Sequence, residues 1–171
     1  IETTDEPRRI AARGNVRSVM SPAPPAPEAG AAASGRAGML DEDQPVYATS
    51  AALDYDRALR LAVYTAESPA QARLWQGDTT IQADRLTVDD STGNLAATGK
   101  VATTFLIEEK DASSGQVRRS PSIGSADDFL YEDDARKATY TGRAHVSGPQ
   151  GDLRASRIVL FLADEANELE R

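Results

Sequence analysis

Large apolar residues recur along this chain at a spacing typical of β-strands. In four segments a small residue is followed three and five positions later by large apolar residues, and polar residues fill most of the places between them. These segments are 48–55, 81–88, 124–131 and 153–160. A spacing of two puts side chains on one face of a strand, and the step of three shifts the phase by one residue. The shared template therefore predicts four half-buried strands, each with a β-bulge or bend in its middle.

A turn and a second strand follow each of these segments. The clearest turn is Asp89-Asp-Ser-Thr-Gly-Asn94, which is rich in residues that favour hairpin turns. The return strands carry an apolar-x-small-x-Gly pattern, which is clearest at 95–101 and 138–146, visible at 10–16 and degraded at 62–66. We expect the repeated glycine to permit a bend or a close backbone approach on the inner face. Repetition of such units predicts an all-β stack of antiparallel hairpins.

Two polar segments interrupt the repeat, at 18–45 and 108–122. The first holds SPAPPAPEAG and has no periodicity, which is typical of a linker or long loop, and the second is a shorter polar version. We therefore divide the chain into the end of a preceding β unit (1–17), a Pro/Ala-rich loop or linker (18–45) and one domain of hairpin repeats (46–171). The chain starts without methionine and stops inside a strand pattern, so we expect an excised fragment whose signal peptide or anchor lies elsewhere.

Composition narrows the possible functions. The 171 residues are enough for one ordinary domain, and the formal net charge of -8 without a clustered basic face argues against a general nucleic-acid binder. The absence of cysteine excludes disulfides, thiolate nucleophiles and cysteine metal sites. No run of 18 apolar residues is present, so this stretch contains no sequence pattern for a transmembrane helix.

Candidate chemistry is sparse. The single histidine, His145, alternates with Ala144 and Val146 and should face outward, which leaves no histidine pair for a metal and no triad. The acidic pairs at 89–90, 127–128 and 133–134 lack the spacing of a calcium loop and are expected to serve turns and strand edges. Leu74 and Trp75 suit core or edge packing, with an exposed aromatic contact as the alternative. We expect no catalytic site, metal or cofactor.

The apolar face of the strands allows two interpretations. It can form a filled hydrophobic core, or it can leave an apolar groove between two facing sheets because alanine is frequent at inward positions. Each methylene of an acyl chain bound there would contribute about 0.8 kcal/mol. Composition alone leaves both interpretations open.

One stretch resembles a known family. Residues 81–101, IQADRLTVDDSTGNLAATGKV, resemble the hairpin units of the OstA-like lipopolysaccharide-transport family, which includes LptA, LptC and the periplasmic domain of LptD. Segments 140–144 and 153–160 support the resemblance, which covers most of 48–171 and the residues around 10–16. It implies a V-shaped β-jellyroll that accepts lipopolysaccharide acyl chains and pairs end to end with other OstA-like proteins through its edge strands.

The resulting hypothesis is a non-enzymatic, periplasmic lipid-binding or relay protein. It would carry the acyl chains of lipopolysaccharide, or of a related lipid, in an interior slot between the inner and outer membrane. The alternative is a structural β-repeat scaffold that makes only protein contacts. The inward residues expected to line the slot are Ile81, Leu86, Val88, Leu95, Val101, Phe105, Phe129, Tyr131, Tyr140, Val146, Ile158 and Leu160.

Overall fold

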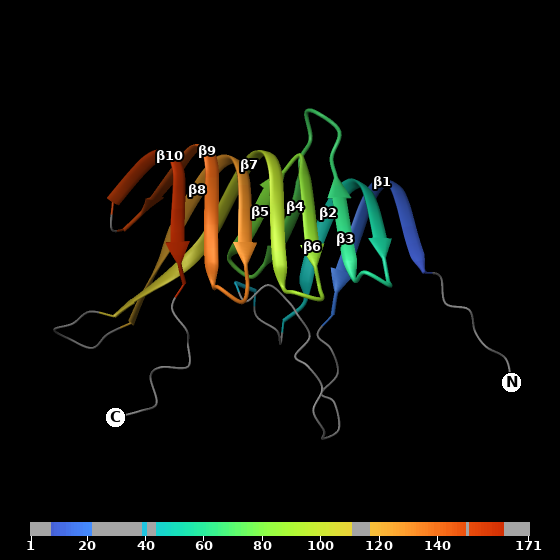
Figure 1. Ribbon diagram of the computed structural model, residues 1–171, viewed down its shortest axis with the longest axis horizontal. Coiled ribbons are helices and arrows are strands. Elements are labelled where there is room, and N and C mark those ends of the chain that lie inside the picture. The colour runs from blue at the N-terminus through green and yellow to red at the C-terminus, as the bar shows by residue number, and fades with distance from the viewer. Residues whose placement is uncertain (1–7, 22–38, 41–43, 111–116, 150, 163–171) are drawn as a thin grey trace, which may run out of the picture.

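The chain forms a single antiparallel β-sheet (Figure 1). The computed structural model describes residues 8–21, 39–40, 44–110, 117–149 and 151–162, and these contain ten strands and no helix. Among the described residues there is accordingly no helix that could cross a membrane. The all-β prediction is confirmed. The strands are β1 (Arg9–Met20), β2 (Val46–Asp56), β3 (Leu61–Thr65), β4 (Ala72–Gln76), β5 (Thr79–Ala83), β6 (Arg85–Asp89), β7 (Asn94–Lys110), β8 (Val117–Glu132), β9 (Lys137–Gly148) and β10 (Gly151–Phe161).

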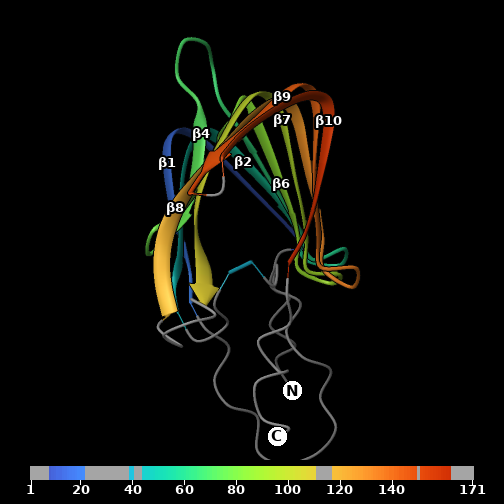
Figure 2. The ribbon, with the colours of Figure 1, turned by 90° about the vertical axis from the view of Figure 1, so that its left-hand side faces the viewer.

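The sheet folds over on itself into two limbs that meet along the top and diverge below (Figure 2). Long strands such as β2 and β7 run through both limbs, whereas β3 and β4 are separated by residues 66–71 and β5 and β6 by Asp84. This is the V-shaped β-jellyroll that the family resemblance implied. The front limb comprises 9–13, 52–56, 61–65, 85–89, 94–98, 128–132, 137–141 and 157–161, and the back limb comprises 16–20, 46–50, 72–76, 79–83, 101–110, 117–126, 144–148 and 151–155.

An extra residue in the return strands produces the bend. Thr98 pairs with Asp128 and Val101 with Ala126, so two residues of β7 face one residue of β8. The same shift occurs in β1 and β9. The inserted pairs, 14–15, 99–100 and 142–143, all have positive φ angles, from 47° to 83°. The predicted bulge is therefore real, but it lies in the return strand. In the first strand of each unit the chain passes the bend without an extra residue. The three-residue step in its apolar pattern arises because the inward-facing positions shift by one residue there.

A carboxylate lies against two of the bulge glycines. A Cβ on Gly99 would come within 2.5 Å of an Asp84 carboxylate oxygen, and a Cβ on Gly142 within 2.5 Å of one on Asp127. The Asp127 side chain is partly exposed and forms an ion pair with Arg143. The predicted bend at these glycines is confirmed, but the close approach comes from an aspartate side chain and not from backbone on the inner face.

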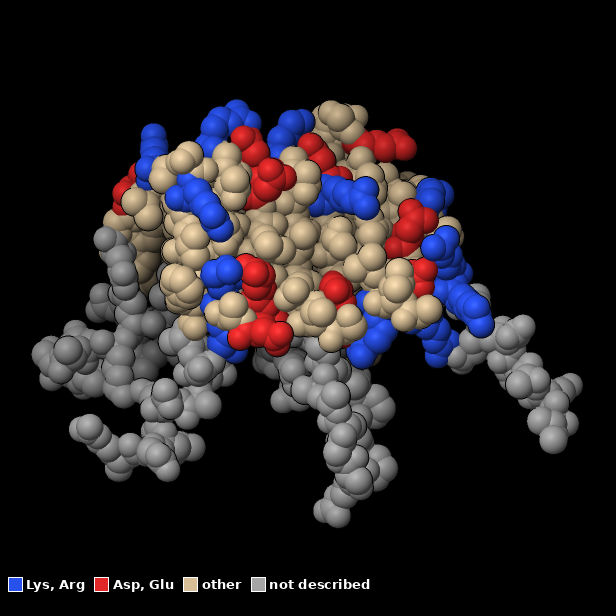
Figure 3. All heavy atoms as spheres, viewed as in Figure 1, with Lys and Arg blue, Asp and Glu red and all other residues tan. Residues whose placement is uncertain are grey.

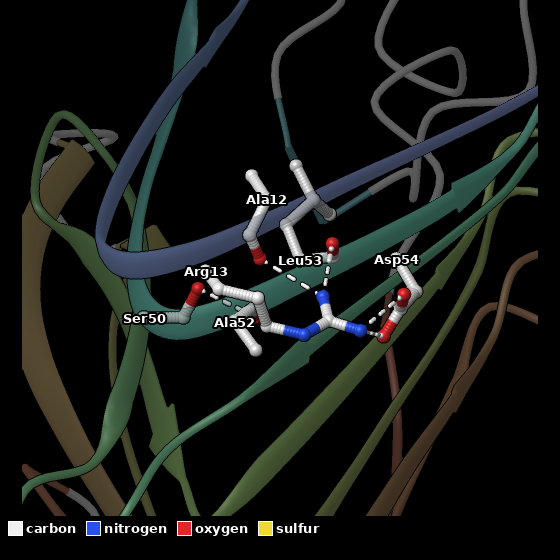
Figure 4. Close-up of polar contacts among 6 residues, drawn as sticks. All are labelled: Ala12, Arg13, Ser50, Ala52, Leu53 and Asp54. Atoms are coloured by element: carbon white, nitrogen blue, oxygen red, sulfur yellow. Dashed lines mark hydrogen bonds and ion pairs between the residues drawn. The ribbon is translucent and has the colours of Figure 1, made fainter.

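The bend at β1 is held differently (Figure 4). The Arg13 guanidinium donates hydrogen bonds to the carbonyls of Ala12 and Leu53, at 2.9 and 3.0 Å, and to the Asp54 carboxylate at 2.8 Å. A Cβ on the neighbouring Gly14 would meet no atom within 4 Å. One arginine thus links both strands at this end of the sheet.

The two interrupting segments are shorter than the sequence predicts. β1 continues to Met20, and Leu40 is buried in the core with 5% of its surface exposed. Residues 22–38 and 41–43 lie outside the described residues, so the linker role of 18–45 stays a prediction. Residues 108–110 and 117–122 were expected in a loop but belong to β7 and β8, which extend past the neighbouring strands. In this extension β7 and β8 pair only with each other, so a polar sequence is compatible with strand structure there.

Candidate functional site

The twelve residues predicted to face inward all lie between the two limbs. Ten are buried in the hydrophobic core, while Val146 and Leu160 are partly buried and pack against it. Their orientation follows the predicted alternation. Whether any of them contacts a lipid remains a prediction. The ten buried residues are Ile81, Leu86, Val88, Leu95, Val101, Phe105, Phe129, Tyr131, Tyr140 and Ile158.

Aromatic side chains fill the interior around β7, β8 and β9. The rings of Phe129 and Tyr140 are 4.8 Å apart between centroids and tilted by 57°. The Tyr140 hydroxyl lies 2.7 Å from Thr103 Oγ1 and both atoms are buried. Burial raises the pKa of Tyr140 to about 12, partly offset by the hydrogen bond with Thr103. In this part of the stack the described side chains form a packed core.

A cavity lies at the opposite end, between β1, β2, β3 and β6. Its volume is about 210 Å³. This corresponds to about seven water molecules at ~30 Å³ each, which is room for a segment of one acyl chain. Its walls are mostly apolar. The lining residues are Ile10, Ser18, Met20, Leu53, Tyr55, Arg60, Ala62, Tyr64, Val88 and Asp90.

Four polar side chains of the cavity lining contact one another in two pairs. Ser18 Oγ and the Tyr64 hydroxyl are 2.9 Å apart, and burial raises the pKa of that phenol. Arg60 and Asp90 form an ion pair at 3.5 Å with both side chains partly exposed. Most of the remaining wall offers hydrocarbon surface, which suits an apolar chain.

Only Val88 of the twelve predicted residues lines this cavity. The signal for other lining residues was present, because Leu53 and Tyr55 belong to the first copy of the template, and Ala62 and Tyr64 to its return strand. The sequence pattern does not show which side chains face each other across the two limbs. Their combined size decides where the interior is filled and where a cavity remains.

The outward candidates take part in local structure. His145 Nε2 lies 2.5 Å from Asp152 Oδ2, and this hydrogen bond is the main cause of a lowered pKa for the Asp152 carboxyl. The Asp89 carboxylate accepts hydrogen bonds from the amide and hydroxyl of Ser91, and these lower its pKa. The described residues contain no group of three or more side chains that could hold a metal ion. Asp89 therefore has the turn role predicted for it.

Charges on the front limb are mixed. Both signs alternate along its upper and lower margins, and an uncharged band lies between them (Figure 3). Alternating charge of this kind favours solubility and offers no single-sign surface on this face for a polyanion.

Comparisons with known proteins agree with the fold. A family model described as "LptA/(LptD N-terminal domain) LPS transport protein" matches residues 47–166. Among solved structures, the chain is similar to LptH from Pseudomonas aeruginosa, the LptA-homologous periplasmic component of a lipopolysaccharide transport device. That similarity has a TM-score of 0.54 at 15% identity and covers 69% of this chain and 76% of that one. No curated protein gives a significant match.

Proposed function

Because this chain belongs to the LptA/LptD N-terminal family of lipopolysaccharide transport proteins, we propose that it is a periplasmic carrier that holds an acyl chain of lipopolysaccharide between its two limbs. The family consists of transport or bridge proteins and not of enzymes. The observation that carries the proposal is the apolar cavity of about 210 Å³ at the β1 end.

The cavity is suited to part of a chain and not to a whole lipid. Each methylene placed there contributes about 0.8 kcal/mol, so a short segment gives useful but reversible binding. Arg60 and Asp90 line the same cavity and are 46% and 38% exposed, so the charged part of the cavity is in contact with water. Reversible binding of part of a chain suits a relay, in which the lipid must also leave.

Site-specific photocrosslinking tests this proposal. β2 offers a matched pair of tyrosines, since Tyr55 lines the cavity and Tyr47 faces outward with 38% of its surface exposed. Replacing each in turn by p-benzoylphenylalanine and irradiating with purified lipopolysaccharide should label the Tyr55 variant strongly and the Tyr47 variant weakly. Equal or absent labelling in folded protein would favour a structural β-repeat scaffold instead.

The ends of the stack provide the second part of the proposal, which is pairing with other OstA-like proteins. Among the described residues β1 and β10 are the two edge strands, each bonded to a neighbour on one side only. Free edges present backbone donors and acceptors to an added strand. End-to-end pairing would join the interiors of successive proteins and so connect the inner and outer membranes.

The lack of cysteine makes this pairing easy to test. A chain carrying both Arg17→Cys on β1 and Arg154→Cys on β10, which lie in the same limb, should form ladders with a short bismaleimide crosslinker. Each single-cysteine chain should stop at dimers. Equal ladders from a chain with cysteines at Thr87 and Arg73, which lie on inner strands, would contradict edge pairing.

A further inference from the structure

An aromatic row lies on the outer face of the back limb, away from the cavity. Val19, Tyr47 and Trp75 are consecutive partners across β1, β2 and β4. The rings of Tyr47 and Trp75 stack with centroids 5.6 Å apart and an interplanar angle of 18°. Val19 is 57% exposed and Tyr47 38% exposed, so this row presents apolar surface to solvent. Large apolar side chains that gather on an outer face often mark an interaction site.

The connection between β1 and β2 starts beside this row. Met20 pairs with Val46, one residue from the Val19 and Tyr47 pair. On the far side, Gln76 donates a hydrogen bond at 3.0 Å from its side-chain amide to the Gln44 carbonyl. The end of β1 and the start of β2 thus lie at the lower margin of the back limb, while Met39 and Leu40 pack against the core. The 17 residues 22–38 begin next to the row and are long enough to cross it before they lead to Met39.

The sequence of this connection fits the row. It begins Pro22-Ala-Pro-Pro-Ala-Pro27, a composition that favours polyproline II. In that helix prolines three residues apart share a side and are separated by ~9.3 Å, while alternate strands of a sheet are ~9.6 Å apart. The pairs 22 and 25, and 24 and 27, can therefore follow the row across the strands.

Charge complementarity adds to the fit. Glu28 follows the prolines. Arg17 and Arg73 both pair with Thr49 in the adjacent row of the same outer face. The Arg73 guanidinium carbon lies over the Trp75 ring, 5.0 Å from its centroid, so a positive charge is part of this surface.

We propose that residues 22–27 of this chain dock as a polyproline II helix on Val19, Tyr47 and Trp75. Aromatic-lined surfaces are a common receptor for such segments. The tether supplies an effective concentration in the millimolar range, so a weak contact is enough to keep the segment bound. Docking covers the exposed row and keeps it from associating with other apolar surfaces.

Trp75 is the only tryptophan, so its fluorescence reports on this surface directly. Acrylamide quenching is measured for the full chain and for a variant in which Pro22, Pro24, Pro25 and Pro27 are all changed to alanine. The proposal expects the quenching constant of the variant to rise about twofold, because loss of polyproline II preference exposes the ring. The matched control, Ala23→Ser with Ala26→Ser, should quench as the unmodified chain does. Unchanged quenching in the proline variant would overturn the proposal.

A peptide in trans completes the test. SPAPPAPEAG, residues 21–30, should restore protection to the proline variant at millimolar concentration. It should fail once Tyr47→Ser is added to that variant, and Thr49→Ala should have no such effect. Protection in the unmodified chain should not depend on protein concentration. Protection that rises with concentration would show that the segment binds another copy, and the intramolecular proposal would be rejected.

Discussion

Gly124 of β8 leaves open the space that the ring of Tyr140 on β9 occupies. A Cβ on Gly124 would lie 2.6 Å from both Cε1 and the hydroxyl of Tyr140, and 2.6 Å from Thr103 Oγ1. The buried hydrogen bond between Tyr140 and Thr103 is made in this space. A missing side chain on one strand therefore allows the tyrosine of the next to fill the interior.

Gly124→Ala should destabilise the fold by about 1–3 kcal/mol, because the added methyl forces Tyr140 or Thr103 out of place. Urea unfolding followed by circular dichroism measures the change. Ser125→Ala is the control, since Ser125 neighbours Gly124 but is only partly buried, and its effect should stay within about 0.5 kcal/mol. Equal effects of the two substitutions would mean that the interior tolerates the extra methyl.

Alkaline pH should destabilise the protein through Tyr140. Its pKa is raised from 10.0 to about 12 in the folded state. The unfolded chain therefore loses the proton first, so the contribution to stability is complete below pH 10 and disappears as the pH rises toward 12. Urea midpoints between pH 8 and 11.5 should fall less steeply for Tyr140→Phe than for the unmodified chain. Parallel slopes would show that this phenol does not control alkaline stability.

Gly142→Ala should be costly for two separable reasons. The φ angle of +77° is strained for alanine by about 1–2 kcal/mol, and the new Cβ would also press on Asp127. An Asp127→Ala background removes the carboxylate and leaves only the Cβ of residue 127, at 2.9 Å, to meet the new methyl, so the substitution should cost less there. Chemical denaturation of the four chains in this double-mutant cycle gives the coupling energy. Strict additivity would rule out the contact with Asp127.

Filling the cavity should weaken lipid binding without harming the fold. Ala62 is buried and lines the cavity, whereas its neighbour Val63 is only partly buried and is absent from the lining. Ala62→Met would displace about two methylenes of a bound chain, which corresponds to ~1.6 kcal/mol or roughly tenfold in affinity. Crosslinking of lipopolysaccharide to the probe at position 55 should fall accordingly, while Val63→Met should leave it unchanged. Loss with both variants would point to a general disturbance of the limb.

Much of the fold could be predicted because the alternation of apolar and polar residues within each strand identifies which of its faces is buried. The alternation around Ile81, Leu86 and Val88 identifies one buried face, and the turn at Asp89 fixes where the chain reverses. The bulge was placed in the wrong strand because the step of three between Ala83 and Leu86 mimics an inserted residue. The inserted residue itself is visible only once the register of β7 against β8 is known.

The site could be predicted only in part. Inward orientation follows from alternation, but free volume depends on which side chains face each other across the two limbs. The ring of Tyr140 fits into the interior because Gly124 on the neighbouring strand has no side chain, while the small side chain of Ala62 leaves part of the cavity open. Such pairings join residues that are far apart in the sequence. For that reason the twelve predicted residues describe the core better than they describe the cavity.

The left-handed residue pairs allow proteins of this shape to change in length by whole hairpins. The bend at Gly99 and Lys100 recurs at Gly142 and Arg143 with nearly the same φ angles, so the hairpins that contain β7 and β9 each carry their own corner. Duplicating the coding sequence of one hairpin would lengthen the interior by about 9.6 Å, two strand spacings, and leave its cross-section unchanged. Deleting one would shorten it by the same step. Evolution can thus adjust the length of such a protein in whole hairpins, with no need to redesign the packing of those that remain.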